Sequence, residues 1–474
     1  MKIKYKSEQR QYKLATTRSK VLCFPTRCFV ILPVIVASNK QLADGEPVHT
    51  ILSHEPDKRL AEACGLARAI DLDIVCQDLI NIHAPRPATL FGSGKIKQLL
   101  DIILRDRIEL VIVDHALSPI QQRNLEKAWC VKVLDRTGLI LEIFGRRART
   151  REGCLQVELA HLTFERSRLV RSWTHLERQR GGFGFLGGPG ETQIETDRRL
   201  LQARINKIEK ELAKVTRTRG LHRKSRRDAP YPTVAIVGYT NAGKSTLFNI
   251  LTNSEVFVQD QVFATLDPTM RALALEGGRT VILSDTVGFI SDLPTTLIAA
   301  FRATLEEVVV ADLILHVRDV HHVETEDQRA DVECVLSELN IDIDIPECRI
   351  IEVWNKIDLL SPSQLEDIQF KAKYYKVPAY LISACSGNGI PALRLAIAEQ
   401  LGKDDIELSL ALPFHAGRLV NWLYENTRVI SLNRSDDGEI KVVVRIAANC
   451  LGRLRSQTQS AGLTVKDTQI IPGD

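Results

Sequence analysis

The sequence of 474 residues lacks a long hydrophobic run. No segment approaches the ~20 unbroken apolar residues that span a bilayer as a helix. The basic N-terminus and the apolar run 21–36 resemble a secretory signal, but Pro25, Arg27 and Pro33 interrupt the run and no clean small-residue cleavage site follows. We therefore expect a cytoplasmic protein with no stable membrane insertion, and we leave peripheral membrane association open.

Paired cysteines are also missing. The ten cysteines form no CxxC pair, and the two closest, Cys23 and Cys28, have no His or Cys cluster that would complete a metal site. Without a secretory context, this pattern argues against a disulfide framework or a zinc site and indicates reduced thiols.

The excess of charge is small. Lys and Arg total 63 against 59 for Asp and Glu, a formal net charge of +4. The global balance therefore does not indicate nucleic-acid binding, although basic residues cluster locally. The length alone predicts about three domains.

One glycine-rich segment fits the P-loop pattern. It follows the β-branched run 233–237 and precedes an expected helix start at 246–251. Glycines let backbone N–H groups turn towards an anion, and the helix N-terminus adds its positive dipole end. Lys244 can reach the β- and γ-phosphates, and Ser245 can ligate Mg²⁺. The predicted nucleotide-binding residues here are Gly238, Tyr239, Thr240, Asn241, Ala242, Gly243, Lys244, Ser245 and Thr246.

Two later segments predict recognition of guanine. Asp358 ends an Asn-Lys-Ile-Asp segment after the strand-like run 349–353, and its carboxylate can accept two parallel hydrogen bonds from guanine. Adenine offers no such pair of donors, so the pattern favours GTP over ATP. Lys356 can cover the base, and Asn355 can reach its imidazole edge or brace the loop. A backbone N–H of the segment after run 379–382 can meet guanine O6; the predicted contacts are Asn355, Lys356, Ile357, Asp358, Ser383, Ala384 and Cys385.

Residues between these two halves are expected to sense the γ-phosphate. Asp285 follows the strand-like run 280–283 and would hold Mg²⁺ through water, while the Gly288 N–H can approach the γ-phosphate. Upstream, Thr265 is the candidate for a second protein ligand to Mg²⁺. The predicted nucleotide-binding residues here are Phe263, Ala264, Thr265, Leu266, Asp267, Asp285, Thr286, Val287 and Gly288.

The residue after Gly288 departs from the Ras-like pattern. Phe289 stands where a Ras-like protein has the glutamine that positions the attacking water. A phenyl ring cannot make the hydrogen bonds that this task needs. We therefore assign no catalytic residue and expect slow hydrolysis unless another group orders the water.

A further set of distinctive segments lies at 118–126, 133–137, 147–153, 187–195, 263–269, 285–290 and 301–307. These segments resemble the HflX family of GTPases, and the resemblance covers roughly residues 28–400. It implies a protein that binds the large (50S) ribosomal subunit through rRNA, splits or rescues stalled ribosomes under stress, and hydrolyses GTP faster on the ribosome. We expect a monomer that uses Mg²⁺, with GTP as substrate and GDP as product.

The expected fold is α/β and multidomain. The predicted parts are an N-terminal extension (1–27), an N-terminal α/β domain (28–145), a helical hairpin with a Gly-rich tip (146–228), a P-loop GTPase domain (229–402) and a small C-terminal α/β domain (403–474). Alternating strand and helix patterns favour a mostly parallel N-terminal sheet. There, Gly92-Ser93-Gly94-Lys95 predicts a turn into a helix; the family's ATP-dependent activities leave a second nucleotide site open.

The hairpin prediction rests on apolar residues at coiled-coil spacing. They include Leu155, Leu159 and Leu162 before the tip and Ile205 and Ile208 after it. The tip, 181–190, is either a solvated flexible loop or a probe whose aromatic rings stack on RNA bases. Basic residues around it suit contacts with the RNA backbone. The candidate RNA-binding residues are Arg178, Arg180, Phe183, Phe185, Arg198, Arg199, Arg223, Lys224, Arg226 and Arg227.

Other functions stay open on the sequence alone. A non-ribosomal regulatory GTPase or an RNA-remodelling NTPase would use the same nucleotide site with other partners. A nucleotide-regulated scaffold without productive hydrolysis would also fit. Co-sedimentation with ribosomal subunits and single-turnover assays distinguish these possibilities.

Overall fold

The structure is a computed structural model. It describes residues 25–36, 55–177, 189–227, 231–253, 263, 269–275, 279–291, 305, 307–339, 341, 349–375, 377–403, 405–413, 416–434, 439–447, 454 and 456–458. The chain divides into two compact units: 1–40 with 59–136, and 41–58 with 137–474. Across the described residues, no helix combines the length and the apolar character needed to cross a bilayer.

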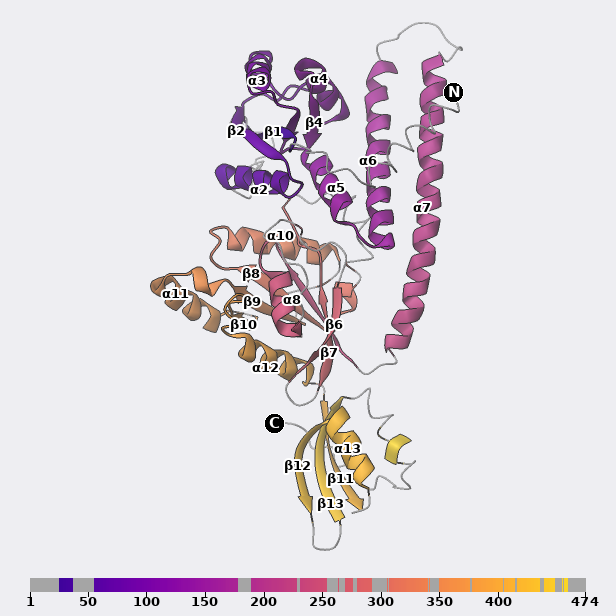
Figure 1. Cartoon of the computed structure of the whole chain (residues 1–474), viewed down its shortest axis with the longest axis vertical. Coiled ribbons are helices and arrows are strands. Elements are labelled where there is room, and N and C mark those ends of the chain that lie inside the picture. Colours follow the sequence, from indigo (N-terminus) through magenta and orange to yellow (C-terminus); the bar gives the residue numbers. More distant parts are fainter. Residues whose placement is uncertain are drawn as a thin grey trace, which may run out of the picture. The chain divides into compact units, whose positions relative to one another are not determined.

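The first unit contains a four-stranded parallel sheet with strand order β2-β1-β3-β4 (Figure 1). Its elements are β1 (Arg27–Ile35), α2 (Pro56–Arg68), β2 (Asp73–Ile82), α3 (Ser93–Arg105), β3 (Leu110–Val113), α4 (Pro119–Trp129) and β4 (Lys132–Asp135). The parallel α/β prediction is confirmed. Pro33 is tolerated in β1 because β3 pairs with β1 only as far as Ile31, so Pro33 has a strand neighbour on one side.

Two polar features stabilise the first unit. Asp114 is buried after β3 and accepts hydrogen bonds from Arg59 Nε at 3.1 Å and Arg136 Nη1 at 2.7 Å. Gly92 caps α3, and Lys95 pairs with Asp78 at 3.1 Å. The Gly-Ser-Gly-Lys segment is therefore a turn into a helix, as predicted, and its lysine has a carboxylate partner.

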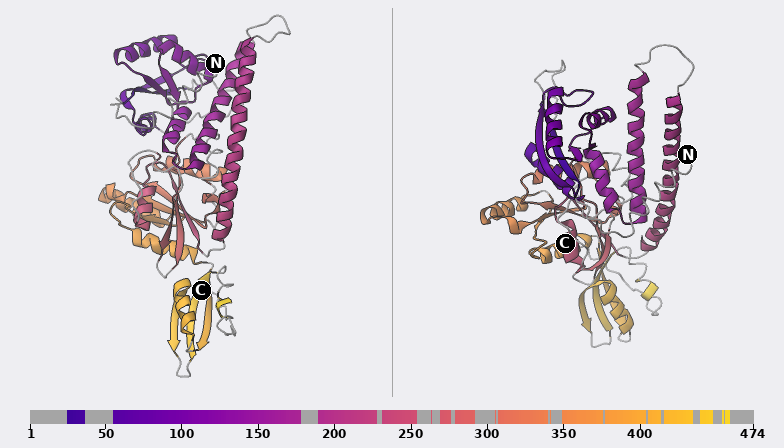
Figure 2. Two further views of the ribbon diagram at one scale, coloured as in Figure 1. Left: turned by 45° about the vertical axis from the view of Figure 1, so that its right-hand side comes forward. Right: turned by 45° about the horizontal axis from the view of Figure 1, so that its top comes forward.

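The second unit begins with α5 (Arg136–Arg147) and two long helices, α6 (Arg151–Glu177) and α7 (Pro189–Arg227). Helices α6 and α7 lie side by side in every view (Figures 1 and 2). Leu162, Ile205 and Ile208 are buried between them, so the described part of the predicted apolar seam forms a core. The Gly-rich tip lies outside the described residues.

The GTPase-like part is a six-stranded sheet with strand order β10-β9-β8-β5-β7-β6. Only β6 runs antiparallel to its neighbour. Helix α8 packs on β5, β6 and β7, while α10 and α12 contact β8. The elements are β5 (Thr233–Gly238), α8 (Lys244–Thr252), β6 (Thr269–Ala274), β7 (Thr280–Asp285), β8 (Leu313–Asp319), α10 (Thr325–Glu338), β9 (Ile350–Asn355), the 3₁₀ turn η1 (Ile357–Leu359), α11 (Pro362–Lys373), β10 (Ala379–Leu381) and α12 (Ile390–Leu401).

The C-terminal part is a three-stranded antiparallel sheet with one helix. Strands β11 (Asp405–Pro413), β12 (Arg428–Arg434) and β13 (Glu439–Ala447) have the order β11-β13-β12, and α13 (Gly417–Asn426) packs on them. These elements match the predicted α/β module. Beyond β13, the described residues 454 and 456–458 are helical.

Candidate nucleotide site

The P-loop connects the buried strand β5 to the start of α8. Its turn uses left-handed backbone at Asn241 (φ 60°) and Gly243 (φ 93°). A Cβ atom on Gly243 would lie 2.2 Å from Asn355 Nδ2, so this close approach requires glycine. The turn directs the N-terminus of α8 at the loop, which is the arrangement that binds an anion.

Lys244, Ser245 and Asp285 converge at this turn, and all three are buried. Ser245 Oγ donates to Asp285 Oδ2 at 2.8 Å, and Lys244 Nζ donates to the Tyr239 carbonyl oxygen at 2.6 Å. Burial lowers the pKa of Lys244 to about 8; the negative charge of Asp285 opposes this effect and the positive charge of Lys356 adds to it. A phosphate anion would therefore find a lysine whose charge is poorly compensated.

A magnesium ion suits the oxygen atoms found here. Mg²⁺ binds through few protein oxygens and keeps waters and phosphate oxygens as its other ligands. The Ser245 hydroxyl and the Asp285 carboxylate already lie within hydrogen-bond distance of each other. The predicted second ligand, Thr265, lies outside the described residues.

The segment after Asp285 runs directly beside the P-loop. A Cβ atom on Gly288 would lie 2.9 Å from Thr240 Cγ2 and 3.0 Å from Lys244 Nζ, so no side chain fits there. Phe289 forms a parallel bridge with Tyr239: its N–H donates to the Gly238 carbonyl at 3.1 Å, and its carbonyl accepts from the Thr240 N–H at 2.8 Å. The Phe289 side chain is 2% exposed and packs inside the protein.

Asn355 braces the base-binding side of the site. Its Nδ2 donates to the Ala242 carbonyl at 2.8 Å, and its Oδ1 accepts from the Ala384 N–H at 2.9 Å. One side chain therefore joins the P-loop to the segment after β10. Of the two roles considered for Asn355 on sequence, bracing is the one the geometry displays.

Lys356 and Asp358 take different positions. Lys356 has left-handed backbone (φ 67°) and pairs with Asp319 at 2.7 Å. Asp358 is exposed in the 3₁₀ turn η1, and its carboxylate makes no ion pair with another described residue. This leaves Asp358 accessible to a base. Ser383 and Ala384, which follow β10, are buried.

Phe263 is the described member of the upstream switch segment. Its ring is buried and meets Phe144 of α5 edge to face, with 4.7 Å between ring centroids. Sequence spacing gave no sign of this pair, because the two positions are far apart in the chain. The remaining predicted residues of that segment, Ala264, Thr265, Leu266 and Asp267, lie outside the described residues.

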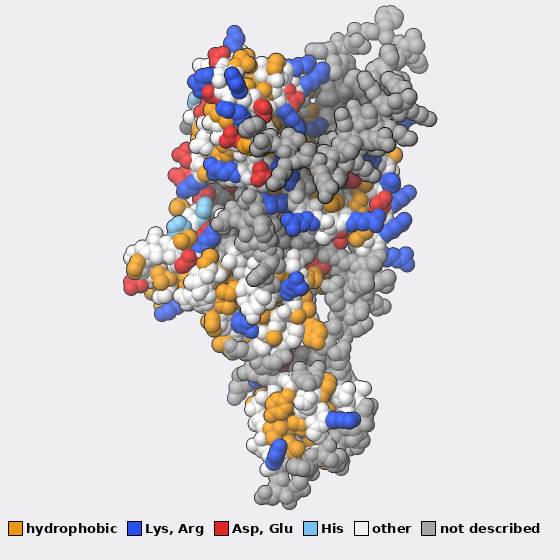
Figure 3. Space-filling view, in the orientation of Figure 1, with side chains coloured by type: hydrophobic (Ala, Val, Ile, Leu, Met, Phe, Trp, Pro, Cys, Tyr) orange, Lys and Arg blue, Asp and Glu red, His pale blue; other side chains and the backbone are white. Residues whose placement is uncertain are grey.

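The RNA-binding candidates are covered only in part. Arg198 and Arg199 are exposed on α7, and further exposed basic residues follow along that helix: Arg204, Lys207, Lys210, Lys214 and Arg217. Figure 3 shows Lys and Arg side chains gathered along this edge. Arg178, Arg180, Phe183 and Phe185 lie outside the described residues, as do the side chains of Arg223, Lys224, Arg226 and Arg227.

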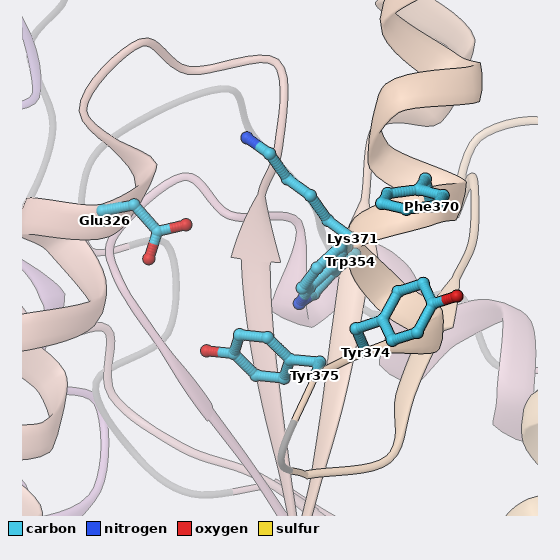
Figure 4. Close-up of a pocket in the computed structure, with 6 residues that line it drawn as sticks. All are labelled: Glu326, Trp354, Phe370, Lys371, Tyr374 and Tyr375. Carbon is cyan, nitrogen blue, oxygen red and sulfur yellow. The ribbon is translucent and has the colours of Figure 1, made fainter.

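A separate hollow of about 510 Å³ opens between α10, β9 and α11 (Figure 4). Four of its six lining residues are aromatic, namely Trp354, Phe370, Tyr374 and Tyr375, and the other two are Glu326 and Lys371. Two of the lining residues contact Arg318, which pairs with Glu326 at 2.8 Å and lies over the Trp354 ring. No P-loop residue lines this hollow, so it is distinct from the phosphate site.

Four family profiles match the chain in succession. They are a GTP-binding GTPase N-terminal region (57–145), a GTP-binding GTPase middle region (147–226), a 50S ribosome-binding GTPase (233–356) and an HflX C-terminal domain (368–459). Among solved structures, the complex of SsGBP with GDP matches with a TM-score of 0.44 and 23% identity, over 79% of this chain and 98% of that one.

Curated relatives match over most of their length. GTPase HflX of Magnetococcus marinus is 46% identical over 407 residues, covering 86% of this chain and 92% of the relative. GTPase HflX of Escherichia coli strain K12 is 46% identical over 363 residues, covering 77% and 84% respectively. Together with the profile matches and the P-loop geometry, these similarities show that the chain belongs to the HflX family of GTPases.

Proposed function

We propose that this protein is a Mg²⁺-dependent GTPase that acts on the large ribosomal subunit and separates or rescues stalled ribosomes. The observation that carries the chemistry is the convergence of Lys244, Ser245 and Asp285 at the P-loop. A lysine, a hydroxyl and a carboxylate at a helix N-terminus are the groups that phosphoryl transfer from a nucleoside triphosphate requires.

Nucleotide binding would replace one of the contacts described above. A β- or γ-phosphate oxygen takes the place of the Tyr239 carbonyl as the partner of Lys244 Nζ. Asp358 accepts from guanine. Because the Ala384 N–H already donates to Asn355, the N–H of Cys385 is the donor that we assign to guanine O6.

Ser245 would hold Mg²⁺ directly, and Asp285 would hold it through a water molecule. When bound, the ion neutralises charge on the phosphate oxygens. Thr265 is the second ligand that we propose.

Hydrolysis would need help from a partner. At the position where a water-positioning glutamine stands in Ras-like proteins, the Phe289 ring is buried and has no polar atom. The described part of the site thus offers no side chain at that position to orient the water. We infer slow turnover of the isolated protein and faster turnover on its partner.

The large ribosomal subunit is the partner that the molecule suits. The exposed basic residues of α7 can contact an RNA backbone, which is an ionic and salt-dependent interaction. A family profile described as a 50S ribosome-binding GTPase matches residues 233–356. Both features favour the ribosomal function over a regulatory GTPase without an RNA partner.

The test is GTP turnover with and without purified large subunits at equal ionic strength. We expect the subunit to raise the rate by at least about tenfold, since catalytic groups supplied by a partner reach ~10³–10⁵ in other GTPases. Small subunits serve as the matched control. A Lys244→Ala variant in the same mixtures measures contaminating GTPase activity, and equal wild-type rates with and without large subunits would contradict the proposal.

Ribosome splitting is tested separately from hydrolysis. Assembled ribosomes are centrifuged after incubation with the protein and either a non-hydrolysable GTP analogue or GDP. The proposal expects separated subunits, with protein on the large one, in the analogue sample. Protein that sediments with intact ribosomes in both samples would support binding and contradict splitting.

A further inference from the structure

The hydroxyl group of Tyr239 has an unusual place in the P-loop. It accepts a hydrogen bond from the Ser291 N–H at 3.0 Å and donates to Ser291 Oγ at 3.2 Å. Tyr239 is 7% exposed and Ser291 is 2% exposed, so both bonds are shielded from water. The tyrosine of the phosphate loop thereby contacts a residue three positions beyond Gly288, the glycine expected at the γ-phosphate.

These bonds complete a set of contacts on one short segment. The Phe289 N–H and carbonyl are paired with Gly238 and Thr240, and the Ser291 N–H is paired with the Tyr239 hydroxyl. Gly288 stands immediately before the first of these groups and directly against Thr240 and Lys244. The segment is therefore held against the P-loop by bonds that involve no phosphate.

We propose that Tyr239 is a positioning residue for GTP hydrolysis. Its hydroxyl fixes the segment 288–291 so that the Gly288 N–H is in place before the γ-phosphate arrives. In many GTPases the γ-phosphate itself orders the switch loops. Here the Tyr239 hydroxyl orders part of this segment before the nucleotide binds. The effect applies only to binding of the γ-phosphate, since GDP does not reach Gly288. This inference rests on the proposed binding of GTP at the P-loop.

The distinguishing variant is Tyr239→Phe. It removes the hydroxyl and leaves the buried Ser291 N–H without its acceptor, while the ring keeps its packing. An unsatisfied buried donor lowers kcat for GTP, and affinity for a non-hydrolysable GTP analogue, by about 5- to 100-fold. GDP affinity changes by less than about twofold. A loss confined to the triphosphate is a signature that simple destabilisation of the loop does not give.

Two further variants sharpen the experiment. Ser291→Ala removes the hydroxyl acceptor but keeps the N–H bond to Tyr239, so its effect is smaller than that of Tyr239→Phe. In the double variant the losses do not add, because both act through one contact. Tyr231→Phe is the matched control: this tyrosine is 49% exposed ahead of β5, and its variant behaves like the wild type.

Each outcome of this experiment has a defined meaning. Wild-type behaviour of Tyr239→Phe, or an equal loss of GTP and GDP binding, would overturn the positioning role. A selective triphosphate defect with unchanged thermal unfolding supports it. Failure of the wild-type protein to bind GTP in the same assay would instead contradict the proposed function, which keeps the two hypotheses separable.

Discussion

At the scale of single residues, the P-loop lysine makes the site sensitive to pH. Burial lowers the pKa of Lys244 to about 8 from 10.5. Between these two values the unfolded chain binds the proton more tightly than the folded chain, so the stability of the nucleotide-free protein rises with pH across this window. Below about pH 8 the folded lysine is charged and the full cost of burying that charge is present.

The same shift predicts proton uptake on nucleotide binding. Phosphate oxygens restore the charged form of Lys244, so GDP binding takes up about 0.7 proton near pH 8.5 and under about 0.2 near pH 7. Affinity falls as pH rises above about 8. Titration calorimetry in buffers of different ionisation enthalpy measures the uptake; equal uptake at the two pH values would show that Lys244 does not titrate there.

The convergence of the P-loop residues could be predicted from sequence, because phosphate-binding chemistry constrains both residue type and spacing. Lys244, Ser245 and Asp285 meet in the structure as their motifs suggest. The side-chain contacts between distant segments could not be predicted. The bond from Tyr239 to Ser291 and the ring contact of Phe263 with Phe144 depend on how distant segments pack, and packing leaves no fixed spacing in the sequence.

At the scale of elements, the contribution of the apolar seam to the stability of the α6–α7 pair can be measured directly. Ile208 is 4% exposed in that seam, whereas Leu200 on the same helix is 63% exposed. Ile208→Ala should destabilise the helix pair by about 2–4 kcal/mol, because it leaves a cavity. Leu200→Ala should cost less than about 0.5 kcal/mol.

Hydrogen exchange of the amides in α6 and α7 measures this difference. Exchange should accelerate in both helices for Ile208→Ala and stay near wild type for Leu200→Ala. GTP binding should be retained in both variants, because the six-stranded sheet has its own hydrophobic core. Unchanged exchange in Ile208→Ala would mean that the seam contributes little to pairing of the helices.

Element prediction from sequence succeeds where the burial pattern is simple. The parallel sheet of the first unit follows from the alternation of strand and helix patterns. Strand β8 was not predicted, because the polar residues His316 and Arg318 interrupt its apolar run. Both are buried, and Glu352 on the neighbouring strand compensates them: its carboxylate lies 2.7 Å from His316 Nδ1 and 3.5 Å from Arg318 Nη1.

At the scale of the whole molecule, nucleotide binding and ribosome splitting should be separable. Deleting residues 181–190, the predicted hairpin tip, should leave GTP affinity within about twofold of wild type, since the nucleotide site is built from residues 238 onwards. It should abolish the appearance of free subunits. Sedimentation of ribosomes incubated with the deletion variant measures the amount of free subunits. The basic residues of α7 remain intact in this variant and serve as the internal control. Full splitting activity of the deletion variant would show that the tip serves only as a linker.

The two bonds of the Asn355 amide have a consequence for nucleotide exchange. The Asn355 side chain hydrogen-bonds to both the P-loop and the segment after β10. It therefore links the phosphate-binding part of the site to the base-binding part. We therefore expect movement of the P-loop to be coupled to movement of the segment after β10. A factor that promotes exchange of GDP for GTP would then need to displace only one of the two segments.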